Sequence, residues 1–133
     1  MKIAAVIAEY NPFHLGHEYM LTKVRNLGYD GIIAVMSGNF VQRGAPAIVD
    51  KTLRAKAAVQ AGADLVLELP TPYVLSSAEG FAAGGVSILG SFCDYLCFGS
   101  ETGDVESLTE TAGALLSPEF SPALRTALED GCS

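Results

Sequence analysis

The segment KIAAVIAEYNPFHLGH, residues 2–17, indicates how the fold of this chain begins. Its first part, Lys2–Ala8, is a short continuous apolar run with isoleucine and valine, which is typical of a strand buried on both faces. After the loop, apolar residues recur with helical spacing over His17–Leu27, and Gly28 follows where helices commonly end. The segment therefore predicts a buried strand, a short loop and a helix.

Strands and helices alternate along the rest of the chain. Further strands are expected at Gly31–Met36, Asp64–Leu69 and Tyr95–Phe98, and further helices at Lys51–Ala61, from a Ser76–Glu79 capping box to about Leu89, from Asp104 or Val105 to Leu116, and at about Pro122–Glu129. This alternation predicts an α/β fold: a Rossmann-like, doubly wound parallel sheet with helices on both faces. Ligands of such sheets bind beyond the carboxyl ends of the strands, at the topological switch point. We therefore expect the functional residues directly after each strand.

The composition favours one well-filled domain over residues 1–133. Half of the residues are hydrophobic and 17% are charged, which excludes an intrinsically disordered chain. No apolar run is long enough for a membrane span or a signal peptide, so we expect a cytoplasmic protein with no membrane partner. The net charge of −7 argues against RNA binding by this domain alone. Cys93, Cys97 and Cys132 lack the C-x-x-C spacing of a metal or redox site and are expected to be free thiols.

His14 and His17, the only histidines, flank Leu15 and Gly16 at the junction of the first strand and helix. A helix that begins near Leu15 lets both imidazoles face one ligand, and its N-terminus offers N–H groups and a positive dipole end to a phosphate. Gly16 allows close approach to the backbone, and imidazoles can stabilise charge on a transferring phosphoryl group. Neither G-x-x-x-x-G-K-[ST] nor G-x-G-x-x-G occurs. The alternative is that the two histidines only pack or cap the helix.

Four blocks of sequence carry a family resemblance. His14–His17 resembles the H-x-G-H signature of nucleotidyltransferases related to class I aminoacyl-tRNA synthetases. EYNPFHLGH (9–17), MSGNFVQRG (36–44), GADLVLELP (62–70) and FGSE (98–101), in this order, are similar to the bacterial tRNA(Met) cytidine acetate ligase family. The resemblance extends to about Leu108. Members of that family are much longer, with a later serine-rich segment ending in an arginine that meets the ATP phosphates and a C-terminal region that helps hold tRNA. The chain is therefore expected to be an N-terminal, nucleotidyltransferase-like ATP-binding fragment.

The resemblance implies an ATP-dependent ligase. Acetate and ATP would form acetyl-adenylate and pyrophosphate, and the acetyl group would pass to N4 of the wobble cytidine of elongator tRNA(Met), whose binding needs the C-terminal region. His14 and His17 would be the catalytic residues, with no protein metal site and with Mg²⁺ carried by the nucleotide. By similarity, the ATP-binding residues are Ile7, Ala8, Glu9, Tyr10, Asn11, Pro12, Phe13, His14, Leu15, Gly16, His17, Glu18, Tyr19, Met20 and Gly99.

Two other functions remain open at this point. One is a generic adenylyltransferase of the same superfamily acting on a small phosphorylated substrate, which would need a basic pocket for the second phosphate. The other is a truncated module that binds ATP without turnover, because the later serine- and arginine-containing segment is absent from residues 1–133. Retained ATP binding without turnover would distinguish this module from the ligase.

Polar residues near the ends of the second and third strands have two interpretations each. Asn39, Gln42 and Arg43, in the loop 37–47, could orient acetate, a phosphate or the cytidine, or simply be solvated. Glu68 lies inside an otherwise apolar strand just before Pro70, so its carboxylate is either at the exposed end of the strand, where it could serve the site, or paired.

The helix after this loop has simpler expectations. Asp50 is expected to cap its N-terminus, and Gly62 occupies the position of a C′ glycine. Lys51 and Arg54 share one helix face, which we expect to be exposed to solvent rather than bound to RNA.

Overall fold

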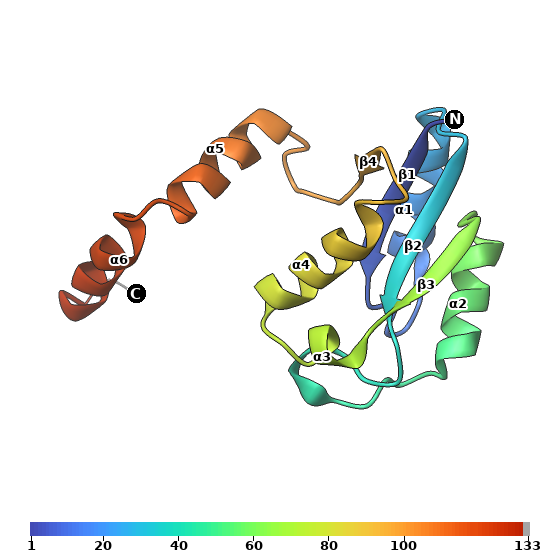
Figure 1. Cartoon of the computed structure of the whole chain (residues 1–133), viewed down its shortest axis with the longest axis horizontal. Coiled ribbons are helices and arrows are strands. Elements are labelled where there is room, and N and C mark those ends of the chain that lie inside the picture. The colour runs from blue at the N-terminus through green and yellow to red at the C-terminus, as the bar shows by residue number, and fades with distance from the viewer. Residues whose placement is uncertain (132–133) are drawn as a thin grey trace. The chain divides into compact units, whose positions relative to one another are not determined.

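The computed structural model describes residues 1–131 and divides into two compact units, Met1–Phe98 and the residues from Gly99 onward. The first unit contains β1 (Ile3–Ala8), α1 (Leu15–Asn26), β2 (Gly31–Ser37), the single 3₁₀ turn η1 (Gln42–Gly44), α2 (Lys51–Gln60), β3 (Leu65–Leu69), α3 (Thr71–Val74), α4 (Ala78–Leu89) and β4 (Tyr95–Leu96). The second contains α5 (Val105–Leu115) and α6 (Phe120–Glu129) (Figure 1). One ATP-binding domain over residues 1–133 stays a prediction, and Cys132 lies outside the described residues.

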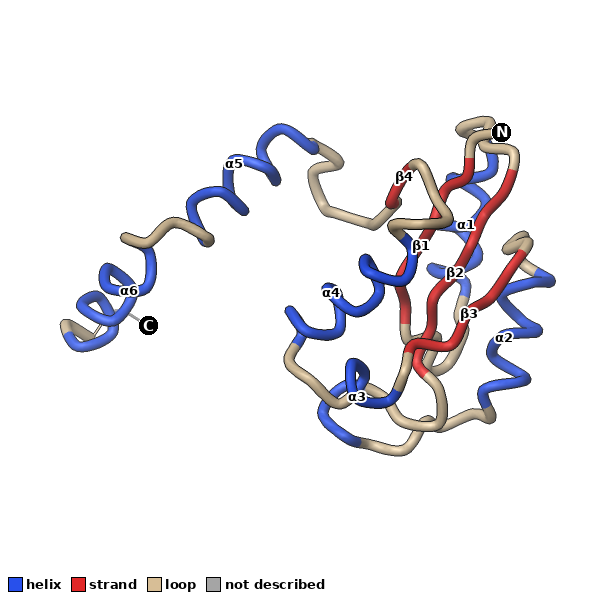
Figure 2. The backbone as a smooth tube through the Cα atoms, viewed as in Figure 1, coloured by secondary structure: helices blue, strands red, loops and turns tan. Residues whose placement is uncertain are grey.

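The strands form one parallel sheet in the order β3-β2-β1-β4 (Figure 2). The first two crossovers add β2 and then β3 on one side of β1, and the third returns the chain to the other side of β1 as β4. The order of the strands therefore reverses between β1 and β4. This is the topological switch point of a doubly wound sheet, and β1 leads directly into the loop that carries His14 and His17.

Helices cover both faces of the sheet, as the alternating elements predict. On one face, Leu21 and Val24 of α1 and Ala58 of α2 pack in a buried cluster with side chains of β1 and β2. On the other face, Val74 of α3 and Phe81 of α4 pack with the intervening side chains of the same strands. Since neighbouring side chains of a strand point to opposite faces, two apolar strands supply both cores. The expected Rossmann-like fold is confirmed.

Several boundaries differ from the expectations. Helix α1 begins at Leu15, two residues before the predicted start, because His14 caps it. The N-cap of α4 is Ser77, not Ser76: Ser77 Oγ accepts the N–H of Gly80 at 3.2 Å. Ser76 instead closes the turn of α3, since its hydroxyl donates to the carbonyl of Tyr73 at 2.6 Å.

Shorter elements also differ. The expected strand Tyr95–Phe98 is reduced to the two residues of β4, and neither α3 nor η1 was expected. Asp50, by contrast, caps α2 as expected and accepts the N–H of Thr52 at 2.8 Å. Gly62 follows α2 with a φ of 114°, a left-handed conformation that favours glycine.

None of the helices within residues 1–131 is both long and apolar enough to cross a membrane.

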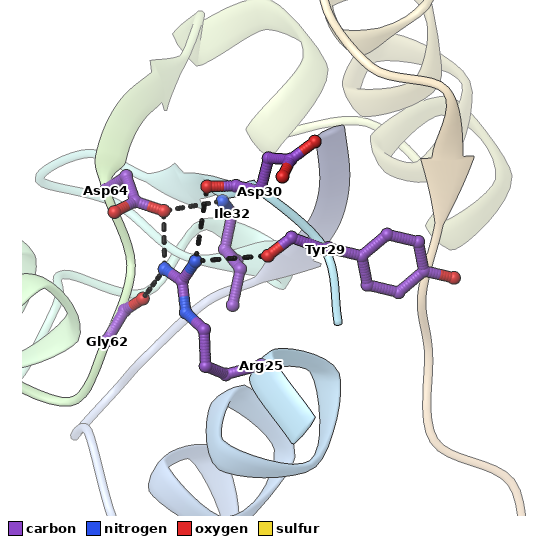
Figure 3. Close-up of polar contacts among 6 residues, drawn as sticks. All are labelled: Arg25, Tyr29, Asp30, Ile32, Gly62 and Asp64. Carbon is purple, nitrogen blue, oxygen red and sulfur yellow. Dashed lines mark hydrogen bonds and ion pairs between the residues drawn. The ribbon is translucent and has the colours of Figure 1, made fainter. Parts of the chain in front are cut away.

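Arg25 joins the amino ends of β2 and β3 (Figure 3). Its Nη2 donates to the Asp64 carboxylate at 2.5 Å and to the carbonyl of Gly62 at 2.9 Å, and its Nη1 donates to the carbonyls of Tyr29 and Asp30. The same Asp64 carboxylate accepts the N–H of Ile32 at 2.7 Å, and these bonds lower the pKa of Asp64. This amino-end clamp, Arg25 with Asp64, lies at the end of the sheet opposite the loop after β1.

Candidate nucleotide site

The two histidines cap the first turn of α1 reciprocally. His14 Nδ1 accepts the N–H of Gly16 at 3.1 Å, and His17 Nδ1 accepts the N–H of His14 at 3.3 Å. The two imidazole rings are stacked, with centroids 3.7 Å apart and an interplanar angle of 23°. The arrangement is a capping box in which histidines replace the usual Ser or Thr and Glu or Gln.

Capping also determines which ring nitrogens are available to a ligand. Because both Nδ1 atoms accept backbone hydrogens, each neutral imidazole carries its proton on Nε2. The two Nε2–H groups are therefore donors that the cap does not use. Capping and phosphate binding are thus compatible roles for His14 and His17.

Gly16 has a role that the motif alone does not reveal. A Cβ at this position would lie 2.9 Å from Cε1 and 3.1 Å from Nδ1 of His14, closer than side chains normally pack. Glycine therefore makes room for the His14 ring to fold over the helix start. The Gly16 N–H, one of the N–H groups at this helix N-terminus, is already bonded to that ring.

Aromatic rings support His17 from the side of the core. Its ring lies 4.8 Å from Tyr10 in an edge-on arrangement and 5.5 Å from Phe13, and the Tyr10 and Phe13 centroids are 5.0 Å apart. Tyr10 is only 2% exposed, and burial raises its pKa to about 12. Burial, and secondly the charge of His14, lower the pKa of His17. A neutral His17 ring is therefore favoured at neutral pH, as the cap requires.

Two residues assigned to ATP by similarity hold the loops after β1 and β2 together. Glu9 Oε1 accepts the N–H of Gln42 at 2.6 Å, and Asn11 Oδ1 accepts the N–H of Ile48 at 2.7 Å. The hydroxyl of Ser37 also donates to the carbonyl of Glu9 at 3.2 Å. The side chains of Glu9 and Asn11 thus have partners within the protein, and their hydrogen bonds fix the loop after β1 against the loop after β2.

Arg54 is buried, contrary to the expectation from the sequence. Expected on an exposed helix face, it is only 1% exposed, and its guanidinium donates to carbonyls at the ends of β1 and β2. One feature of the sequence indicates this burial. Arg54 lies four residues before Ala58, so the two share a helix face, and Ala58 is the small residue of α2 that packs in the core.

Glu68 is paired rather than free. Its carboxylate accepts from Lys51 Nζ at 2.6 Å in a partly exposed ion pair, and a Cβ on Gly38 would collide with it. In the neighbouring loop, Asn39 and Arg43 are exposed, and Arg43 has a φ of 71° in η1. These positions leave their expected roles toward acetate or cytidine as predictions.

Comparison with known proteins identifies the family. The sequence profile described as HIGH Nucleotidyl Transferase matches residues 1–133, the whole chain. The chain belongs to the HIGH nucleotidyl transferase family. The resemblance of His14–His17 to the H-x-G-H signature of nucleotidyltransferases is therefore confirmed.

Curated relatives of this HIGH nucleotidyl transferase are named tRNA(Met) cytidine acetate ligase. The one from Clostridium perfringens is 48% identical over 98% of this chain and 34% of that protein, and the one from Acetivibrio thermocellus is 50% identical over 100% of this chain and 33% of that protein. A crystal structure of Thermotoga maritima TmcAL bound with alpha-thio ATP has a TM-score of 0.87 at 46% identity, covering 100% of this chain and 34% of that one. The chain thus spans about a third of the length of the relatives it matches.

The other residues assigned to ATP by similarity have varied surroundings in this chain. Ile7 and Ala8 end β1, Pro12 is exposed in the loop, and Met20 packs partly buried against the core. Exposed side chains on the first turns of α1 are those of Leu15, Glu18 and Tyr19. Gly99 opens the second unit, and its contribution stays a prediction. Among residues 1–131, no group of three His, Cys, Asp or Glu side chains could hold a metal ion.

Lowering the pH from about 7.5 to about 5 is expected to destabilise the start of α1. A proton added to Nδ1 of His17 removes the acceptor for the His14 N–H. Since the pKa of His17 is lowered in the folded chain, the unfolded chain binds more protons in this range, and the free energy of unfolding decreases as the pH is lowered. The loss is at most the value of a helix cap, about 1 kcal/mol.

Urea denaturation at a series of pH values measures this effect. His17→Gln is the control, because glutamine accepts a hydrogen bond at the same capping-box position and does not titrate. Its stability is expected to vary less between pH 5 and 7.5. The same pH dependence in both proteins would show that the His17 cap is not responsible.

Proposed function

We propose that the chain is the ATP-binding part of a tRNA(Met) cytidine acetate ligase, and that His14 and His17 bind the nucleotide phosphates. The observation that carries this proposal is the reciprocal cap, which leaves two Nε2–H donors at the N-terminus of α1 beside the switch point of the sheet. A helix N-terminus attracts anions, and charge-assisted bonds to phosphate oxygens are strong. The names of the relatives and the alpha-thio ATP bound by the Thermotoga maritima protein support the same function.

The proposed reaction has two steps. An oxygen of the acetate carboxylate bonds to the α-phosphorus of ATP while the bond from that phosphorus to pyrophosphate breaks, which yields acetyl-adenylate. The Nε2–H groups would stabilise the negative charge that develops on the phosphate oxygens. In the second step, N4 of the wobble cytidine attacks the acetyl carbonyl, AMP leaves, and N4 loses a proton.

The partners of this reaction are acetate and elongator tRNA(Met), and we assign the protein to the cytoplasm with no membrane partner. The net charge of −7 gives this chain little attraction for RNA, so tRNA binding is assigned to the remaining two thirds of the length of its relatives. The described residues include no group of three His, Cys, Asp or Glu side chains that could bind a metal ion, so we propose that Mg²⁺ is bound by the phosphates of the nucleotide.

A module that binds ATP without turnover is the second candidate. The observation in its favour is the share of the relatives that the chain covers, 34% of the Clostridium perfringens protein. The two candidates share the nucleotide site and differ only in catalysis. We do not propose a generic adenylyltransferase, because Lys51 and Arg54, two cations near the strand ends that could hold a second phosphate, are already paired with Glu68 and with carbonyls.

Titration calorimetry of the 133-residue chain with ATP tests the proposal. We expect binding of ATP and much weaker binding of CTP and GTP. If this chain binds no nucleotide but a full-length relative does, residues beyond this chain complete the pocket. If neither binds ATP, the proposed function is wrong.

A further inference from the structure

We propose that Arg54 is a positioning residue of the nucleotide site: its buried guanidinium holds the backbone after β1 and thereby sets the place of the histidine pair. The effect of Arg54 on nucleotide binding rests on the proposed function. Its structural part, the dependence of the His14–His17 cap on Arg54, stands independently of any nucleotide.

The contacts of Arg54 gather three separate segments. Nη1 donates to the carbonyl of Glu9 at 2.6 Å, just after β1, and to the carbonyl of Ser37 at 3.0 Å, at the end of β2. Nη2 donates to the carbonyl of Gly38, and Nε donates to the carbonyl of Val49 at 2.9 Å, just before α2. One side chain thus joins the carboxyl ends of the two central strands to the start of the next helix.

The hydrogen-bond partners of Arg54 require several N–H donors in a fixed arrangement. Its hydrogen bonds go to carbonyls and to the Ser37 hydroxyl, and within residues 1–131 it has no ion pair. A guanidinium offers five N–H donors in a fixed planar fork, whereas a lysine offers three donors at a single point. Only an arginine can therefore satisfy these three segments together.

A short chain of contacts leads from Arg54 to the histidines. The carbonyl held by Arg54 belongs to Glu9, and the next residue, Tyr10, has a φ of 52° and turns the chain toward α1. The Tyr10 ring then packs edge-on against His17 at 4.8 Å, and His17 accepts the N–H of His14. A shift of the Glu9 carbonyl therefore moves the support on which His17 rests.

The amino-end clamp supplies a matched control. Arg25 also donates to carbonyls and ties strand ends together, but at the amino ends of β2 and β3 (Figure 3). If Arg54 only stabilises the fold, loss of Arg25 and loss of Arg54 should affect the histidines alike. If Arg54 positions the site, only its loss should disturb them.

The test compares Arg54→Met, Arg54→Lys and Arg25→Met in the 133-residue chain. The first readout is the imidazole nitrogen NMR spectrum at about pH 8, where the capped rings give the signals of single Nε2–H tautomers. We expect Arg54→Met to shift both rings toward a mixture of tautomers, Arg54→Lys to do so to a smaller extent, and Arg25→Met to leave them unchanged. The lysine variant decides the question if Arg54→Met does not fold.

The second readout is affinity for ATP, expected to fall at least about tenfold in Arg54→Met, equal to about 1.4 kcal/mol, and to stay unchanged in Arg25→Met. Wild-type histidine signals in both Arg54 variants would overturn the inference. If the wild-type chain binds no ATP but the Arg54 variants still disturb the histidines, the proposed function fails in this chain and the positioning role stands.

Discussion

Replacing His14 and His17 together by alanine is expected to lower the affinity for ATP at least about 100-fold while the sheet remains folded. Each hydrogen bond to a charged group contributes about 1.5–3 kcal/mol, so the loss of two Nε2–H donors removes about 3–6 kcal/mol of binding free energy. Every 1.4 kcal/mol corresponds to a tenfold change in the dissociation constant. Titration calorimetry measures the affinity, and circular dichroism shows whether the helices persist.

Two further variants separate phosphate binding from helix capping. His14→Asn keeps a good N-cap for α1 but has no donor at the distance of Nε2, so it should lose affinity with little loss of stability. Ser77→Ala removes the N-cap of α4, a helix end that carries no histidine, and should lose stability of about 1 kcal/mol with unchanged affinity. An unchanged affinity in the double alanine variant would remove the histidines from the site.

Replacing Leu21 by alanine is expected to lower the free energy of unfolding by about 2–5 kcal/mol. Leu21 is 1% exposed and, with Val24, is one of the two buried side chains of α1 in the core shared with β1 and β2. Loss of its side-chain carbons removes apolar burial and leaves a cavity that close-packed neighbours fill only in part. For a chain of this size, such a change is a large part of the total stability.

Chemical denaturation in urea measures this loss, with Leu53→Ala as the control. Leu53 lies on α2 and is 59% exposed, so its truncation should change the free energy of unfolding by no more than about 0.5 kcal/mol. Equal losses in both variants would mean that the core on this face of the sheet does not depend on Leu21.

The sequence predicted the strands and the position of the two histidines at the start of α1 because both follow from local patterns. Apolar runs such as Ile3–Ala8 can be recognised as strands without tertiary context. A parallel sheet then brings the carboxyl ends of its strands to one edge. The H-x-G-H spacing likewise predicts that His14 and His17 lie together at the start of a helix.

The features that could not be predicted from the sequence depend on contacts that local patterns do not record. Arg54 reads as a surface residue because its acceptors, the carbonyls of Glu9 and Ser37, are backbone atoms that no side-chain pattern records. The choice of Ser77 over Ser76 as the cap of α4 depends on α3, a single turn too short to show periodicity. Gly16 was expected to allow a ligand to approach the backbone. Its contact with the His14 ring was not predicted, because that contact depends on the rotamer of His14, which the sequence does not give.

The reciprocal cap has a consequence for how this domain can evolve. Serine and glutamine at positions 14 and 17 would form an ordinary capping box, so a descendant could lose both imidazoles and still fold. Capping of α1 therefore places no demand on histidine at either position, and a domain under no selection for nucleotide binding could become well folded but inert. A library screened for stability alone would accept such variants, whereas a library screened for ATP binding, the proposed role of the two histidines, should reject them.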